Sequence, residues 1–304
     1  YEIPLRLVGS EMCIRDRGKA EAIRHYGDLY DFQVVKDGDK LSLGKRELTF
    51  VTLPMLHWPD SMATYCADDG ILFSNDAFGQ HYAAAKRFDD EVDLGILFYE
   101  AKKYFANILW PYAKLIDKAL AKAAALDLKM IATAHGIIWR SHIQEIIAKY
   151  AAWGKGVSGS SVVIAYDTMW GATEQMARAV LEGVVSAGSD AVLLRMNETP
   201  NSTAVADLFE AGGMIIGSST LNSGMLPTMG SLLVYLKGLN PTGKKAAVFG
   251  TYGWAGGAQK DMEALLTAAG FELEPGFTCK WKAQPEDLEA ARQLGYEFAR
   301  KLQK

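Results

Sequence analysis

Apolar runs alternate with helical segments in the second half of this chain, and that alternation limits the possible folds more than any other feature. The apolar runs carry few polar residues, as expected for strands that helices cover on both faces. Regular strand–helix alternation predicts a doubly wound parallel sheet, an α/β fold with five strands. The expected strands are Val162–Tyr166, Ala191–Leu194, Met214–Gly217, Lys245–Gly250 and Phe277–Trp281, and the expected helices are Thr173–Ser186, Thr203–Glu210, Met229–Leu236, Gln259–Ala269 and Pro285–Leu302.

Length and composition exclude several classes of protein. A chain of 304 residues has room for two domains. A net charge of −4 argues against nucleic acid as a partner, and the sequence contains no apolar run long enough to span a membrane. The three cysteines, Cys13, Cys66 and Cys279, are scattered, which is typical of a reducing compartment. With no signal peptide visible, we expect a cytoplasmic location.

The first half mixes strand and helix patterns. Expected strands are Phe32–Val35, Lys40–Leu43, Glu47–Leu53, Ile71–Ser74 and Met130–Ala134, with a hairpin turn at Asp37-Gly38 between the first two. Helical patterns cover Asp93–Asn107 and Pro111–Leu126, and Ser141 is the expected cap of a further helix. A Gly/Ser-rich stretch at residues 154–160 predicts a linker between a domain at 18–153 and a domain at 161–304.

Residues 8–17, VGSEMCIRDR, match no helix or strand period. The string resembles the translated read-through of a sequencing adapter. We therefore expect residues 1–17 to be non-native and the genuine sequence to start near Gly18, after the loss of its true beginning. An ordinary N-terminal arm is the alternative.

The segment Thr168–Thr173 joins the first strand of the second half to a helix. Its two threonine hydroxyls, with Gly171 between them, suit a phosphate held by the helix N-terminus. The loop has no lysine, so it is not a Walker A motif, and it is not GxGxxG. A monophosphate fits best. The alternative is that Thr173 only caps the helix.

Glycine-rich loops follow two other strands of the same half. They read GSSTLNSG from Gly217 and GTYGWAGG from Gly250. Ligands of doubly wound folds bind at the carboxyl ends of the strands, where these loops lie. Tyr252 or Trp254 could stack on a flat ring, or could simply cover the end of the sheet.

These three loops resemble the FMN site of the flavodoxins, over about 140 residues and with the expected strand order 2-1-3-4-5. The resemblance implies FMN as cofactor. The residues that it assigns to FMN are Thr168, Met169, Trp170, Gly171, Ala172, Thr173, Ser219, Thr220, Leu221, Asn222, Gly224, Thr251, Tyr252, Gly253, Trp254 and Gly256.

Three polar residues of the first half each follow a predicted strand: His57, Asp76 and His135. Strand ends of this kind can converge at one rim of a sandwich. Imidazole together with carboxylate suits zinc or iron. Taken singly, each residue could be an ordinary core or surface group.

The strings around them, LPMLHWPDSM and FSNDAFGQH, resemble the flavodiiron proteins, in which a metallo-β-lactamase-like αββα sandwich precedes a flavodoxin domain. The resemblance implies that Asp76 bridges two irons, that His57 binds one and His135 the other, and that His81 lies in the pocket wall. His142 has no ligand role in it. The family's H-x-E-x-D-H string is absent here, so the sandwich is expected to be partial and these three ligands are too few for two irons.

Membership of this family implies an oxidoreductase that reduces O2 to water or NO to N2O. Electrons would come from rubredoxin or a similar small donor, through FMN to a non-haem diiron site, within a head-to-tail homodimer. Because ligands are missing, we expect this chain to be impaired. Alternatives are an FMN-binding electron carrier with an inert metal-domain remnant, and a zinc hydrolase fused to a flavodoxin module.

Overall fold

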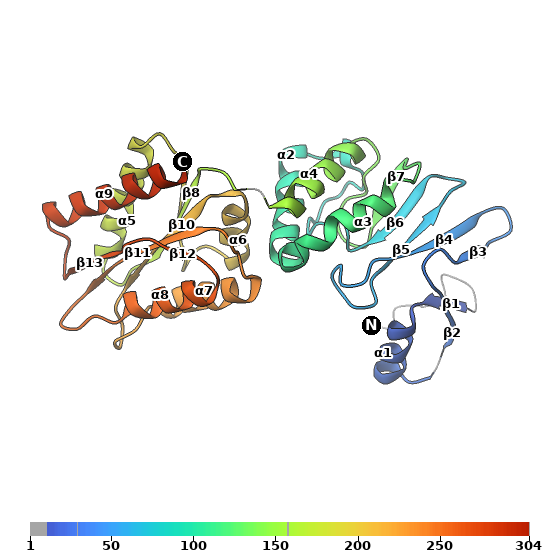
Figure 1. Ribbon diagram of the computed structural model, residues 1–304, viewed down its shortest axis with the longest axis horizontal. Helices are drawn as coiled ribbons and strands as arrows, with labels where there is room; N and C mark the ends of the chain where they lie inside the picture. The colour runs from blue at the N-terminus through green and yellow to red at the C-terminus, as the bar shows by residue number, and fades with distance from the viewer. Residues whose placement is uncertain (1–10, 29, 157, 304) are drawn as a thin grey trace. The chain divides into compact units, whose positions relative to one another are not determined.

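The computed structural model describes residues 11–28, 30–156 and 158–303 (Figure 1). It forms two compact units. One contains the described residues up to Tyr104 together with Tyr112–Lys155, and the other contains Phe105–Pro111 and the described residues from Gly156 onward. The predicted non-native segment 1–17 lies partly outside the described residues, as does residue 157 of the predicted linker. The helix α4 (Ile143–Lys155) includes the first two residues of that linker.

The sheet of the second unit confirms the predicted α/β fold. Its strands run in the spatial order β12-β11-β10-β8-β9, and β13 also pairs with β11. All these pairings are parallel. In chain order this is the predicted 2-1-3-4-5. The strands are β8 (Val162–Asp167), β9 (Ala191–Arg195), β10 (Gly213–Ser219), β11 (Lys245–Tyr252), β12 (Glu272–Leu273) and β13 (Phe277–Lys280).

The fifth strand position is divided into two pieces. Pro275 and Gly276 separate β12 from β13, which pair with the beginning and the end of β11. Proline has no backbone N–H to donate, so the ladder is interrupted there. β13 nevertheless ends level with Tyr252, at the carboxyl edge of the sheet.

Helices cover both faces of this sheet (Figure 1). On one face α5 (Ala172–Ser186) and α9 (Pro285–Leu302) pack together over alternate residues of β8, with Phe298 and Met176 buried in the same cluster. The other helices are α6 (Asn201–Glu210), α7 (Pro227–Leu239) and α8 (Ala258–Ala268). The central strands β8 and β10 are buried along their whole length, which explains why they are apolar up to their carboxyl ends, where Asp167, Ser218 and Ser219 lie.

The first unit contains a five-stranded sheet in the order β3-β4-β5-β6-β7. Its neighbours are antiparallel from β3 to β6, whereas β6 and β7 are parallel. This single sheet, with helices packed beside it, is a partial form of the predicted sandwich. The strands are β3 (Lys40–Ser42), β4 (Glu47–Thr52), β5 (Met62–Cys66), β6 (Ile71–Asn75) and β7 (Met130–Thr133); β5 has no counterpart among the predicted strands.

The predicted hairpin at Asp37-Gly38 is wrong. The strand β2 (Asp31–Val34) pairs in parallel with β1 (Glu11–Ile14) across the helix α1 (Asp16–Tyr26), and not with β3. Gly38 instead donates its backbone N–H to Phe50 of β4, and the Asp37 carboxylate binds Lys122 and Thr52. The Asp37-Gly38 dipeptide is typical of a hairpin turn, but here the tertiary contacts of Asp37 determine the path of the chain.

The predicted helix Asp93–Asn107 ends earlier as an α-helix, at Tyr104 in α2 (Leu94–Tyr104). A π-helical turn, Phe105–Leu109, and a 3-10 helix, Trp110–Leu115, follow before α3 (Ile116–Ala123). Proline at position 111 cannot donate to an α-helical ladder, which accounts for the change of geometry there. No helix among the described residues has the length and apolar character needed to cross a membrane. Cys66 and Cys279 are free and buried.

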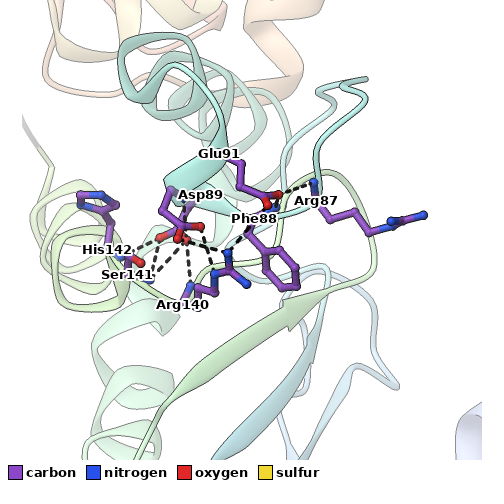
Figure 2. A network of polar contacts seen from close by, with 8 residues as sticks. Arg87, Phe88, Asp89, Glu91, Arg140, Ser141 and His142 are labelled. Atoms are coloured by element: carbon purple, nitrogen blue, oxygen red, sulfur yellow. Dashed lines mark hydrogen bonds and ion pairs between the residues drawn. The ribbon is translucent and has the colours of Figure 1, made fainter.

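Asp89 is a buried carboxylate that anchors the start of α4 (Figure 2). It accepts the backbone N–H groups of Arg140, Ser141 and His142, the last at 2.6 Å. Asp89 therefore binds the N–H groups before the helix, where Ser141 was expected to act as the cap. Beside it the Arg140 guanidinium lies 3.7 Å from the centre of the Phe88 ring and pairs with Asp90.

We expect Asp89→Ala to destabilise the first unit by about 2–4 kcal/mol, because the buried N–H groups that it binds would lose a charged acceptor. Urea unfolding followed by tryptophan fluorescence measures this. Asp90→Ala is the matched control, since the half-exposed pair of Asp90 with Arg140 should contribute less than about 1 kcal/mol. Equal losses in the two variants would contradict the anchoring role.

Lys244 is a buried cation in the second unit. Its Nζ donates to the carbonyl oxygen of Ala211, at the end of α6, and lies 5.7 Å from the centre of the Trp110 ring. Burial lowers the pKa of Lys244 to about 8, partly offset by the charge of Glu210. The folded state thus binds a proton at this site less tightly than the unfolded chain does.

This difference in proton binding makes the free energy of unfolding increase with pH. Between pH 8 and about 10.5 the unfolded chain keeps the Lys244 proton that the folded protein releases, so stability rises with pH in that window. We expect the wild type to gain on the order of 1–3 kcal/mol over this window relative to Lys244→Met. Urea titrations at several pH values measure the difference, and a pH-independent difference would refute the prediction.

Candidate functional site

Asp76 and His135 lie at neighbouring strand ends of the first unit. Asp76 directly follows β6 and His135 follows β7, and these strands are parallel, so their carboxyl ends meet at the same edge. His57 comes from the loop between β4 and β5. The structure brings together the three residues that the sequence pattern singled out.

Each oxygen of the Asp76 carboxylate faces a different imidazole. His57 Nε2 lies 3.3 Å from Asp76 Oδ2, and His135 Nε2 lies 3.1 Å from Asp76 Oδ1. When two donor atoms each lie about 2.1 Å from the same metal and the donor–metal–donor angle is about 90°, the two donors are about 3 Å apart. The two separations therefore fit two metal positions, one at each oxygen of a bridging carboxylate.

The described residues contain no group of three or more His, Cys, Asp or Glu side chains around a single metal position. Metals of this kind take about four or more ligands each. The three donors present therefore fit the centre of a two-metal site but do not complete it.

Aromatic side chains border the same site. The His81 ring packs edge-on against His135, at 5.5 Å between centroids, and against Tyr104, at 4.9 Å. Burial raises the pKa of the Tyr104 hydroxyl, and the negative charge of Asp76 raises it further. Tyr104 thus stays a neutral hydroxyl near the carboxylate. His142 lies apart, with its Nδ1 2.9 Å from Glu145.

The second unit has a pocket of about 750 Å³ at the carboxyl ends of its strands. Predicted residues that line it are Met169, Trp170, Ala172, Ser219, Thr220, Leu221, Asn222, Thr251, Tyr252, Gly253 and Trp254. Of the predicted set, Thr168, Gly171, Thr173, Gly224 and Gly256 are not among its lining residues. The sequence analysis missed Gln175, Ser223, Ala255, Trp281 and Lys282.

Three buried hydroxyls form the floor beneath the loop Thr168–Thr173. Thr173 Oγ1 lies 2.9 Å from both Ser219 Oγ and Thr251 Oγ1. The interpretation of Thr173 as a simple helix cap is wrong, because Gly171 is the N-cap, in a left-handed conformation that glycine adopts without strain. Thr173 instead joins the ends of β10 and β11 to the start of α5.

Exposed aromatic rings surround the pocket. Trp170 is 91% exposed, Trp254 87% and Trp281 61%. Trp281 follows β13, donates its backbone N–H to Tyr252 and packs beside Gly253. Lys282 is the one charged residue among the described residues that line the pocket. The sequence could have indicated Trp281 and Lys282, because they directly follow the last parallel strand, as the other pocket loops follow their own strands.

These features fit a flat ring that carries a phosphate. The volume lies within the range usual for cofactor pockets. Hydroxyls and a helix N-terminus suit the phosphate, and the described lining includes no carboxylate to repel it. Exposed aromatic side chains offer stacking surfaces for the ring.

Comparisons with known proteins match both halves of the chain. The family "Flavodoxin" matches residues 164–295, and the "ODP family beta lactamase" matches residues 9–136. A nitric oxide reductase of Moorella thermoacetica is 45% identical over 91% of this chain and 71% of that protein.

Solved structures agree over nearly the whole chain. The flavodiiron protein of Giardia intestinalis has a TM-score of 0.93 at 35% identity, over 96% of this chain and 73% of its own. The rubredoxin oxygen:oxidoreductase of Desulfovibrio gigas has a TM-score of 0.91 at 35% identity, over 96% of this chain and 75% of its own.

We expect Thr173→Val to weaken FMN binding about tenfold, because Ser219 and Thr251 would each lose a hydroxyl partner beneath the phosphate loop. Fluorescence titration of the protein, freed of flavin, measures this. Riboflavin, which lacks the phosphate, should bind with unchanged affinity.

Thr267→Val is the control for that substitution, since the Thr267 hydroxyl bonds only within α8, to the carbonyl of Glu263. An equal loss of riboflavin affinity in Thr173→Val would show that the hydroxyl cluster does not serve the phosphate.

Proposed function

Because this chain belongs to the flavodiiron proteins, we propose that it is an oxidoreductase that passes electrons from FMN to a non-haem diiron site, where NO or O2 is reduced. The observation that carries the proposal is the Asp76 carboxylate with one imidazole at each oxygen. Related proteins with this two-domain arrangement are a nitric oxide reductase and a rubredoxin oxygen:oxidoreductase.

The FMN site would use the pocket at the strand ends of the second unit. The N-terminus of α5 and the loop Thr168–Thr173 would hold the phosphate, supported by the buried Ser219 and Thr251 hydroxyls. Tyr252 and the indoles of Trp254 and Trp281 would flank the ring and limit its access to water. When bound, FMN supplies a carrier that accepts two electrons and releases them singly or together.

The metal site would use His57, Asp76 and His135. Asp76 would place one negative charge between two cations and lower their repulsion, while each imidazole would supply a neutral donor to one of them. When bound, the irons supply the centre at which a diatomic substrate is reduced. Tyr104 and His81 would line the space beside them and exclude water from it.

The finer assignments remain part of the proposal. A rubredoxin or a similar small protein would donate the electrons, as the name of the Desulfovibrio relative says of that protein. A head-to-tail homodimer would bring each FMN close to the partner's irons. A cytoplasmic location follows from the cysteine pattern.

The alternative of an FMN-binding electron carrier is favoured by one observation. Three candidate donors lie together among the described residues, His57, Asp76 and His135, and two irons need more than three. If the metal domain is inert, the purified protein should contain FMN but no iron.

Metal content of the Asp76→Asn variant tests the diiron assignment. The amide bears no charge and offers one oxygen, so we expect iron per chain to fall by about tenfold or more while the FMN content stays unchanged. The proteins are purified under anaerobic conditions. Inductively coupled plasma analysis then measures iron per chain, and the visible absorbance of the flavin measures FMN per chain. Asp117→Asn, at an exposed position of α3, is the control and should retain the wild-type iron content.

Stopped-flow mixing of the photoreduced protein with NO or with O2 completes the test. Flavin reoxidation should be faster in the wild type than in Asp76→Asn. The gas that reoxidises the wild-type flavin at the higher rate is the preferred substrate. Wild-type protein with bound FMN and no iron would replace the proposed function by the electron carrier. Zinc in place of iron, with hydrolase activity, would favour the hydrolase.

A further inference from the structure

Gln80 is a fully buried side chain between the loops that carry Asp76 and His135. We propose that it is a positioning residue, whose amide fixes the separation of these two ligands and thereby the metal affinity of the site. The inference rests on the proposed function, because it takes Asp76 and His135 to be metal ligands.

The amide of Gln80 is bonded to both loops at once. Its Nε2 donates to the carbonyl of Phe78, at 2.9 Å, and to the carbonyl of Ile137, at 3.2 Å. Its Oε1 accepts the backbone N–H of Ile137 at 2.7 Å. Both amide hydrogens are therefore used, and they bind backbone groups two residues beyond Asp76 and two residues beyond His135.

The backbone of Gln80 adds a contact to the ligand residue itself. Its N–H donates to the carbonyl of His135 at 3.3 Å. Trp139 makes a further link between the loops, from its indole N–H to the carbonyl of Phe78, but it lies farther from His135 in the chain. Thr133 Oγ1 also donates to the carbonyl of His135, at 2.8 Å, but this bond lies within the His135 loop, whereas Gln80 bonds backbone groups near both ligands.

Two glycines let the loops approach closely enough for these bonds. A Cβ atom on Gly136, whose φ is +80°, would lie 2.2 Å from Gln80 Oε1 and 2.4 Å from its carbonyl oxygen. A Cβ atom on Gly79 would lie 3.4 Å from the carbonyl oxygen of His135 in the other loop. The two loops therefore meet backbone to backbone, and Gln80 is the polar side chain that fills the contact.

Only glutamine meets all the demands of this position. Glutamate has the same length but no hydrogen to donate, so it would set an anion against the carbonyl oxygens of Phe78 and Ile137. Methionine has a similar volume and satisfies none of the three bonds. Groups that orient metal ligands in this way typically change metal affinity by about 10–100-fold when they are replaced.

Cobalt titration of Gln80→Met tests the proposal. Co²⁺ added to metal-free protein under anaerobic conditions gives visible absorption bands that report ligand geometry. We expect the apparent Co²⁺ affinity to fall about tenfold or more, with shifted bands, while FMN content and circular dichroism match the wild type. Gln80→Glu, which keeps the bond to the Ile137 N–H, is the second variant and should also bind Co²⁺ more weakly.

Asp89→Asn is the matched control for loss of stability alone. Asp89 is as buried as Gln80 and also binds backbone groups of the segment after His135, but it contacts residues 140–142 and not the ligand loops themselves. We expect this variant to lose stability and keep its Co²⁺ affinity within about twofold.

The possible outcomes distinguish the positioning role of Gln80 from the proposed function. Unchanged Co²⁺ affinity and bands in folded Gln80→Met, or an equal loss in Asp89→Asn, would overturn the positioning role and leave the proposed function standing. Failure of both Gln80 variants to fold would also overturn it, because Gln80 would then serve the fold alone. Wild-type protein without cobalt bands would overturn the metal assignment and this inference with it.

Discussion

Parallel pairing of neighbouring strands is the constraint on which both candidate sites depend. Strands that run in the same direction end at the same edge of a sheet, so the loops that follow them converge. In the first unit β6 and β7 are the parallel pair of an otherwise antiparallel sheet, and they bring Asp76 next to His135. In the second unit every described pairing is parallel, and four loops surround one pocket.

Convergence alone does not fix side chains to within the fractions of an ångström that metal or flavin chemistry requires. Buried polar groups supply that precision in both units. Gln80 holds the backbone at Phe78 and Ile137, two residues beyond Asp76 and His135. Thr173, Ser219 and Thr251 join three segments beneath the phosphate loop. Each group is costly to bury unpaired, so each also enforces one arrangement of the loops around it.

The two sites suit complementary steps of one redox process. An aromatic pocket whose described lining holds no carboxylate favours a ring with a phosphate, whereas a partly buried carboxylate between two imidazoles favours paired cations. The two family models match different parts of this chain, the β-lactamase-like one residues 9–136 and the flavodoxin one residues 164–295. Each candidate site lies within one of these parts.

Apolar periodicity and the rule of strand ends are local signals, so the α/β class, the strand order of the second unit and most of the pocket lining can be predicted from the sequence. It also singled out His57, Asp76 and His135 by their places after predicted strands. It failed where distant contacts override local ones. Asp37-Gly38 looks like a hairpin, but Asp37 binds Lys122 and Thr52.

Contacts between segments that are distant in the chain determine which groups hold the sites in place. The position of Thr173 in the loop predicts a phosphate contact or a helix cap, and the structure shows a buried hydroxyl that links two strand ends. Ser141 looked like a cap, but Asp89, distant in the chain, binds the N–H groups there. Gln80 matches no sequence period that relates it to Ile137. Its role depends on which backbone groups lie beside it, and those are set by packing between segments that periodicity does not relate.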